Sequence, residues 1–279
     1  MILLLLMVPY EIRSGSMEIV DRNKNIFKNG IEIYSENLYI TAKQAVQTDA
    51  SIMLKDSVFL KGKKFSLSAD YLNYKVPYKI VFGSGNVKIW KEDTLIGDSL
   101  IFFREKEEGK LIGNLIFISD SVLIKGESAD FFEDSVVIRG SPEFKSPEIR
   151  VKSDYTVYIV RDSIYKFLSD VKFETSNILG NSGRLIHNCK NEISTLLDEP
   201  FILEERDSIT GDMIFVDHKA NIMKSLNGRV ITYTEDGRNI VWGDTINIYY
   251  DEDTIDSVLV KGKSRGSFAK NETQGGKSN

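Results

Sequence analysis

One short phrase recurs four times in this chain: DSVFLKG from Asp56, DSVLIKG from Asp120, DSVVIRG from Asp134 and DSVLVKG from Asp256. A fixed phrase that returns along a chain is the signature of a repeat architecture. Asp-Ser has turn chemistry, the apolar triplet after it favours a strand, and Lys/Arg-Gly closes that strand. The sequence therefore predicts a stack of short β-strands.

Relaxed copies of the phrase fill the gaps, as GNVKI, SDVKF, EPFIL and GRVIT, and most steps between copies are 28 to 35 residues. A second motif lies between them, as SADYLNY around Asp70, GDSLIFF around Asp98, SADFF around Asp130 and GDTINIYY around Asp244. Apolar residues occupy alternate positions in both motifs, which is the pattern of half-buried antiparallel strands. The expected unit is two strands with their turns.

Composition supports a folded chain without catalytic or nucleic-acid chemistry. Of 279 residues 42% are hydrophobic, and 36 basic residues stand against 41 acidic ones. This balance gives no electrostatic footprint for nucleic acid. The two histidines lack metal spacing, and the recurring Asp residues are too far apart to share one ion, so we predict no enzyme, no metal and no cofactor. Cys189 is expected to be a half-buried small hydrophobe; the alternative is a reactive thiol beside His187.

Three segments are predicted. Residues 1–30 are expected to hold a signal-sequence remnant and a lead-in strand, because Ile2–Val8 is an apolar run; the alternative is a first strand or a disordered end. Residues 31–266 hold the repeats. Residues 267–279 are polar and Gly-rich and are expected to form a disordered tail.

The two motifs together resemble the OstA/LptA-like family, the organic-solvent-tolerance N-terminal domain of the lipopolysaccharide transport bridge. The copies that carry the resemblance best are SADYLNY, GNVKIWKEDTLIGDSLIFF and GRVITYTEDGRNIVWGDTINIYY. The resemblance covers about Ile31 to Gly266. The chain departs from the family in its greater length and in one 14-residue step between copies, which leaves open whether it is the bridge subunit or a relative.

The resemblance implies an all-β fold, an open antiparallel β-jellyroll (β-taco) built from repeated two-strand units. It also implies an apolar groove that holds the acyl chains of lipopolysaccharide or a related glycolipid, in a periplasmic or outer-membrane-associated protein of a Gram-negative-type envelope. Implied partners are further copies head to tail and the inner- and outer-membrane transport components. The alternative function is a structural β-solenoid scaffold or surface protein without lipid cargo.

Strand parity gives a predicted groove lining, composed of inward-facing apolar residues. These are Val58, Leu60, Tyr74, Val87, Ile89, Leu100, Phe102, Phe132, Val171, Phe173, Ile214, Val216, Ile246 and Ile248. The last phrase, DSVLVKG, is followed by a short polar remainder that offers nothing to cover its strand. Because an uncovered strand edge recruits another strand, we predict an assembly edge at Val258, Leu259 and Val260, with the opposite edge near Ile31.

Overall fold

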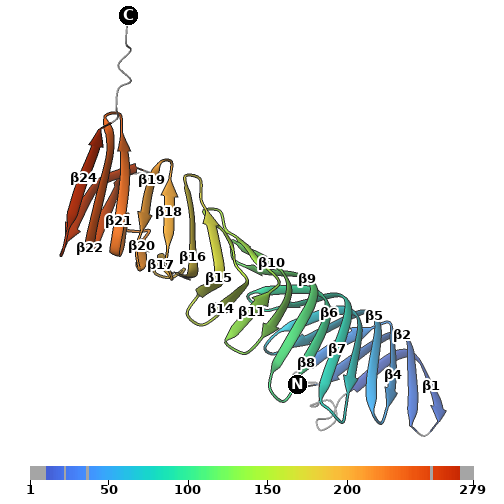
Figure 1. Ribbon diagram of the computed structural model, residues 1–279. Coiled ribbons are helices and arrows are strands. Elements are labelled where there is room, and N and C mark those ends of the chain that lie inside the picture. The colour runs from blue at the N-terminus through green and yellow to red at the C-terminus, as the bar shows by residue number, and fades with distance from the viewer. Residues whose placement is uncertain (1–10, 22, 36–37, 252–253, 271–279) are drawn as a thin grey trace, which may run out of the picture. The chain divides into compact units, whose positions relative to one another are not determined.

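The computed structural model describes residues 11–21, 23–35, 38–251 and 254–270 (Figure 1). Within these ranges every regular element is a β-strand, and all the strand pairs are antiparallel. The described residues include no helix that is long and apolar enough to cross a membrane. The prediction of an all-β antiparallel fold is confirmed.

The chain forms two compact units, Met1–Ser146 and Pro147–Asn279. The strands of the first unit are β1 (Glu11–Asp21), β2 (Lys24–Ser35), β3 (Leu38–Ala42), β4 (Gln44–Thr48), β5 (Ser51–Gly62), β6 (Ser66–Lys75), β7 (Ile80–Trp90), β8 (Thr94–Phe103), β9 (Glu108–Ser119), β10 (Val122–Phe131), β11 (Ser135–Arg139) and β12 (Glu143–Lys145). Within the unit, successive long strands pair as neighbours from β5 to β10 (Figure 1).

The second unit repeats this pattern with its own strands. They are β13 (Arg150–Lys152), β14 (Tyr155–Ile159), β15 (Ile164–Glu174), β16 (Ile178–Asn188), β17 (Ile193–Leu197), β18 (Phe201–Glu204), β19 (Asp207–Thr210), β20 (Met213–Asp217), β21 (Ile222–Thr234), β22 (Gly237–Asp251), β23 (Thr254–Lys261) and β24 (Arg265–Lys270). Four long strands form two neighbouring pairs, β15 with β16 and β21 with β22. On its other side β15 pairs with the short strands β13 and β14, and β16 pairs with β17 and β18. In the same way β21 pairs with β19 and β20, and β22 pairs with β23 and β24.

Each long strand of the first unit is bent near its middle. The β6–β7 register shifts between Ser68 and Tyr71, and the β7–β8 register shifts between Ser84 and Val87. A bulge bends a strand and increases its twist. One half of each strand therefore lies in one layer and the other half lies in a second, facing layer. The strand pairs define the two layers. Layer A contains β3 and residues 58–61, 66–68, 87–90 and 94–96; layer B contains β4 and residues 51–55, 71–75, 80–84 and 99–103.

Two aspartates of the second motif, Asp70 and Asp98, lie at these bends. The Asn86 side-chain amide donates to the Asp70 carboxylate at 2.9 Å, and Asn114 donates to Asp98 at 2.8 Å. Gly113, just before Asn114, has φ +82, and a Cβ there would lie 2.3 Å from the Asp98 carboxylate oxygen. A glycine is therefore required beside the carboxylate, both for its backbone conformation and for space. Asp70 and Asp98 therefore hold bends within continuous strands.

The repeated heptapeptide has two structural roles, which corrects the prediction of uniformly short strands. In DSVVIRG, Asp134 precedes β11, as expected for a turn. In DSVFLKG, Asp56 and Ser57 lie inside β5 with φ values of 62° and 56°, at the bulge between Lys55 and Val58. Turn chemistry allows positive φ, and here it serves a mid-strand bend, so β5 is twice as long as the phrase suggests.

Apolar side chains fill the space between the layers, and a row of aromatic rings lies outside layer A. Tyr39 packs 4.9 Å from Tyr34 and 6.4 Å from Phe59, measured between ring centroids, and Phe59 packs 6.0 Å from Trp90. Cross-strand ring contacts of this kind stabilise a sheet. They explain why the outer face is less polar than a simple alternation would give.

The described strands extend past two of the predicted boundaries. β1 pairs with β2 and precedes Ile31, so the first edge of the described chain lies at β1. β24 pairs with residues 237–242 of β22, so residues 267–270 of the predicted polar tail belong to a strand. The apolar run Ile2–Val8 and the remainder of the tail from residue 271 lie outside the described residues.

Candidate functional site

The two layers of the first unit enclose an apolar cavity. Layer A contributes Leu60, Leu67 and Ile89, and layer B contributes Leu72, Val81, Leu100 and Phe102; Phe65, Phe131 and Arg104 complete the lining. Leu67 and Leu72 come from the two halves of β6, on either side of its bend. The cavity measures about 20 Å³, little more than the space of one water molecule. The layers are therefore in contact, and their side chains occupy the groove.

The structure places most of the predicted lining residues inside. Those that are buried are Val58, Leu60, Tyr74, Val87, Ile89, Leu100, Val171, Phe173, Ile214, Ile246 and Ile248. Phe102 and Val216 are half-buried. The residues of the first unit face its own interior, and those numbered 171 and above belong to the second unit.

Phe132 does not face inward, which corrects its place in the predicted lining. Its side chain is 39% exposed, whereas Ala129 is fully buried and Phe131 lines the cavity. The physical reason is the position of the bulge. In β10 the register shifts between Gly126 and Ser128, before Asp130, so no bend follows Asp130 to reverse the parity.

Two further residues, Arg104 and Phe65, line the cavity and were not predicted from the sequence. Arg104 follows β8 at the parity of Leu100 and Phe102, so continuing the alternation by one step would have found it. Phe65 lies in the turn between β5 and β6, where no periodicity operates. The edge of its ring packs against Phe102 at 5.8 Å, and Phe102 stacks on Phe131 at 6.2 Å, both measured between centroids.

A charged contact joins the two layers beside these rings. The Lys64 ammonium lies 2.5 Å from a Glu107 carboxylate oxygen and 3.3 Å from one of Glu133. Lys64 lies in a layer A turn, whereas Glu107 and Glu133 lie in turns at the end of layer B. Hydrogen bonding to Glu107 raises the pKa of Lys64, and the same bond lowers the pKa of Glu107. Lys64, Phe65, Glu107 and Glu133 together are called the clasp below.

The second unit holds a polar cluster around Ser194. The Ser194 hydroxyl lies 3.0 Å from Nδ1 of His187 and 2.9 Å from Nε2 of His218. His187 has the inward parity of buried Leu185, and His218 has that of buried Ile214. Burial, and then the neighbouring His218, lowers the pKa of His187 to about 4, and burial also lowers the pKa of His218. Both imidazoles are therefore neutral at pH 7.

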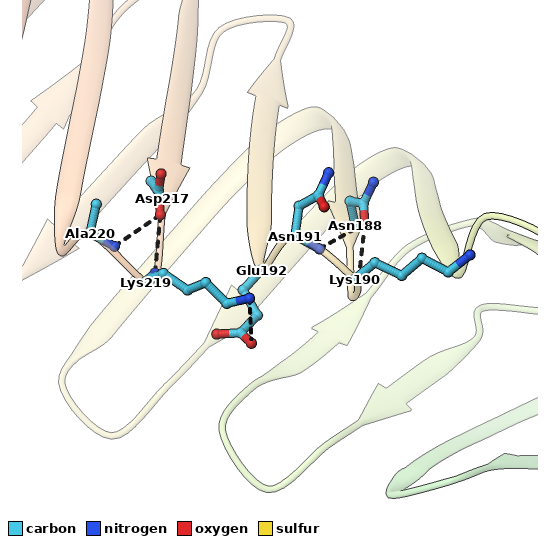
Figure 2. Close-up of polar contacts among 7 residues, drawn as sticks. All are labelled: Asn188, Lys190, Asn191, Glu192, Asp217, Lys219 and Ala220. Atoms are coloured by element: carbon cyan, nitrogen blue, oxygen red, sulfur yellow. Dashed lines mark hydrogen bonds and ion pairs between the residues drawn. The ribbon is translucent and has the colours of Figure 1, made fainter.

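The turns beside this cluster are ordered by side-chain oxygens (Figure 2). Asn188 Oδ1 accepts hydrogen bonds from the backbone N–H groups of Lys190 and Asn191, at 3.0 and 3.2 Å. Asp217 Oδ1 accepts from Lys219 and Ala220 in the same way, at 3.1 and 2.9 Å. Such turns fix the backbone through the side chain. The ammonium of Lys219 then reaches Glu192 at 3.4 Å and ties one turn to the next.

Strands at the ends of the described chain present open edges. In the part of the chain that the structure describes, β1 pairs only with β2, and β23 pairs only with β22. Ile19 of β1 is 70% exposed and Leu259 of β23 is 46% exposed; Val258 and Val260 are half-buried. Among the described residues, β1 and not a strand near Ile31 is the first strand. Assembly through the edge at Val258, Leu259 and Val260 stays a prediction.

Fold and interior together define an antiparallel β-jellyroll with an apolar space between its layers. The chain belongs to the family described as LptA/(LptD N-terminal domain) LPS transport protein, whose model matches residues 66–222, more than half of the chain. No curated protein matches the sequence. Solved structures with some likeness include LptH from Pseudomonas aeruginosa, described as the LptA-homologous periplasmic component of the lipopolysaccharide transport device. That match is 10% identical, has a TM-score of 0.36, and covers 38% of this chain and 82% of LptH.

Proposed function

We propose that this chain is a periplasmic bridge protein that binds lipopolysaccharide, or a related glycolipid, and passes it towards the outer membrane. The acyl chains would lie between layers A and B, and the sugars would stay in water. Membership of a transport family supports this function over that of a structural solenoid. The observation that carries it is the cavity of the first unit, whose lining is entirely apolar apart from Arg104.

Lipid binding requires layers A and B to move apart. A cavity of about 20 Å³ is far smaller than the pockets of roughly 300–1,000 Å³ that hold small ligands. The interior would open as acyl chains replace side-chain contacts between the layers, an exchange of one apolar contact for another. The clasp lies where the two layers meet at their turns, and its ion pairs are exposed, so opening it costs little.

Assembly would be head to tail, through strand pairing between the C-terminal edge of one copy and β1 of the next. An open edge carries unpaired N–H and C=O groups, and an incoming strand satisfies them. Because the two edges differ, their pairing is heterologous and continues from copy to copy. Inner- and outer-membrane transport components would pair with the two terminal edges of such a chain.

Native mass spectrometry of the protein purified from its own envelope tests the cargo. The expected spectrum contains adducts with the mass of lipid A-bearing species, and these adducts disappear on delipidation. Phe102→Asp should reduce them, because a carboxylate makes this part of the interior polar, whether or not it pairs with the neighbouring Arg104. Phe102→Ala removes the same ring without introducing a charge, and it serves as the control for a folding defect. A native preparation that carries no lipid at any protein concentration would refute the proposed cargo.

A further inference from the structure

Two polar groups stand unpaired at the otherwise apolar interior of the first unit. Among the described residues, none accepts a hydrogen bond from the buried Nε of Arg104, and none pairs with the buried hydroxyl of Tyr74. Arg104 lines the cavity described above, and Tyr74 lines the neighbouring apolar cavity, which shares Leu60, Leu72 and Val81 with it. Buried donors without partners are rare in folded proteins and commonly mark a functional position.

Chain geometry brings the two groups to the same end of layer B. Tyr74 is the last inward residue of β6, after Leu72, and Arg104 continues the inward parity of β8. The turn between β6 and β7 connects them, because the backbone N–H of Arg104 donates to the Lys79 carbonyl at 3.1 Å. The Arg104 charge acts on Tyr74: burial raises the pKa of this tyrosine, and the guanidinium partly opposes that rise.

The neighbouring carboxylate of Glu105 forms no ion pair with Arg104, although its pKa is lowered first by Lys79 and then, to a smaller extent, by the Arg104 charge. Glu105 forms its hydrogen bond and ion pair with Lys79. No described residue forms an ion pair with Arg104, which lines the cavity together with Leu100 and Phe102. A guanidinium is always charged and presents donors in a fork that fits phosphate and carboxylate groups. A neutral tyrosine hydroxyl adds one further donor.

We propose that Arg104, assisted by the Tyr74 hydroxyl, is an anion-recognition site that selects amphiphiles carrying a phosphate or carboxylate beside their acyl chains. The site rests on the proposed function, because the acyl chains would occupy the cavity while the anionic group meets Arg104. The pairing satisfies two buried donors that the protein leaves open. It also fixes the depth to which the amphiphile enters, since the charge remains at the end of layer B.

Displacement of a fluorescent acyl probe measures the selectivity. The ligands are lipid A with both phosphates, the same acylated disaccharide with both phosphates removed, and inorganic phosphate alone. We expect wild type to bind the phosphorylated lipid roughly 10- to 100-fold more tightly than the dephosphorylated one, the range given by one charge-assisted hydrogen bond. Inorganic phosphate should not displace the probe, because it brings no acyl chain. Displacement by phosphate alone would indicate a free-anion site and overturn the proposal.

Four variants locate the effect. Arg104→Gln should bind both lipids with the affinity that wild type has for the dephosphorylated lipid. Tyr74→Phe keeps the aromatic ring and should lose part of the preference for the phosphorylated lipid. Lys88→Gln removes an exposed positive charge from the outer face of the same unit and should behave as wild type. Equal folding stability is checked by urea denaturation. Arg104→Lys keeps the charge without the fork and should retain a reduced preference.

The outcomes separate this inference from the proposed function. If wild type and Arg104→Gln bind both lipids with equal affinity, the anion site is refuted while lipid binding stands. If Arg104→Gln keeps the full preference for phosphate, recognition lies at another residue and the inference is again wrong. If neither lipid displaces the probe from the wild-type protein, the proposed function itself is refuted.

Discussion

Asn114 donates a side-chain hydrogen bond to Asp98 at 2.8 Å, across the bends of two neighbouring strands. Asn86 and Asp70 form the same pair one step earlier, and Asn227 and Asp212 form it in the second unit at 2.8 Å. The pair recurs because each bend places an asparagine with positive φ beside the aspartate carboxylate of the preceding strand. At Asn114 the φ angle is 46°. These contacts hold the angle at which a strand passes from one layer to the other.

Asp98→Ala should lower the free energy of unfolding by about 1 kcal/mol, the typical net value of one hydrogen bond. Urea denaturation followed by circular dichroism measures the change. Asp49→Ala is the matched control, because Asp49 is an exposed acidic residue in the turn before β5. If the two substitutions cost the same, the Asp98–Asn114 pair does not stabilise the bend.

These bends show what the sequence could and could not predict. The strand identity of both motifs followed from alternation, because one face of strands such as β6 and β8 is buried. The strand lengths did not follow, because Asp-Ser and Gly-Asp have the same local chemistry in a turn and at a bulge. Only pairing across neighbouring strands decides between the two, and a local pattern does not contain that information.

The inward-facing residues of a strand could be predicted wherever the bulge lies at the aspartate of the second motif. Leu72 and Leu100 follow their aspartates across a bend, whereas Phe131 follows Asp130 with no bend between them. The earlier position of the bulge in β10 therefore moves the inward position from Phe132 to Phe131. Arg104 was missed for a different reason: it lies one residue beyond the end of β8, where the inward parity continues.

Stability should fall as the pH is lowered from about 7 towards 4, because His187 and His218 are held neutral. Burial lowers the pKa of His187 to about 4, so the unfolded chain binds protons below pH 6.5 that the folded chain rejects. Unfolding then becomes easier by about 2 kcal/mol over this range. The loss is moderated at His218, whose pKa the charges of Glu148, Asp217 and Glu192 act to raise.

Replacing both histidines with Gln isolates this effect from the titration of carboxylates. The variant should show a flatter dependence of unfolding free energy on pH between 7 and 4.5 than wild type. Thermal denaturation across the same buffers gives the comparison. Parallel curves for the two proteins would show that the histidines do not set the acid sensitivity.

Locking the clasp should block lipid entry. In a Cys189→Ser background, Lys64→Cys and Glu107→Cys joined by a cleavable bis-maleimide would tie a layer A turn to a layer B turn. We expect the acyl probe to bind at least about tenfold more slowly, because the open state is removed from the population. Cleaving the linker should restore the rate.

The matched control joins Lys91→Cys to Glu92→Cys in the same background. These adjacent residues lie in one turn of layer A, so the linker spans no boundary between the layers. Binding should be unaffected by this linker. Unchanged binding after locking the clasp itself would mean that lipid enters without separating the layers at these turns.

Two edge variants test head-to-tail assembly. Ile19→Pro disrupts the β1 edge and Val258→Pro disrupts the β23 edge, because proline removes a ladder donor. Each variant alone should be monomeric by light scattering at micromolar concentration, with its strand content retained, while wild type forms concentration-dependent oligomers. An equimolar mixture should form one-to-one dimers and nothing longer, since only one intact pair of edges remains. Dimers of a single variant would indicate that like edges meet instead.

Site-specific photo-crosslinking in the native envelope tests the central claim most directly. A photoreactive residue at Phe102 would sit in the cavity lining, and one at Lys88 would lie exposed on the outer face of the same unit. Lipopolysaccharide crosslinked at Phe102, with none at Lys88, is the result that transport between the layers predicts. Equal labelling at both positions, or labelling at Lys88 alone, would contradict it.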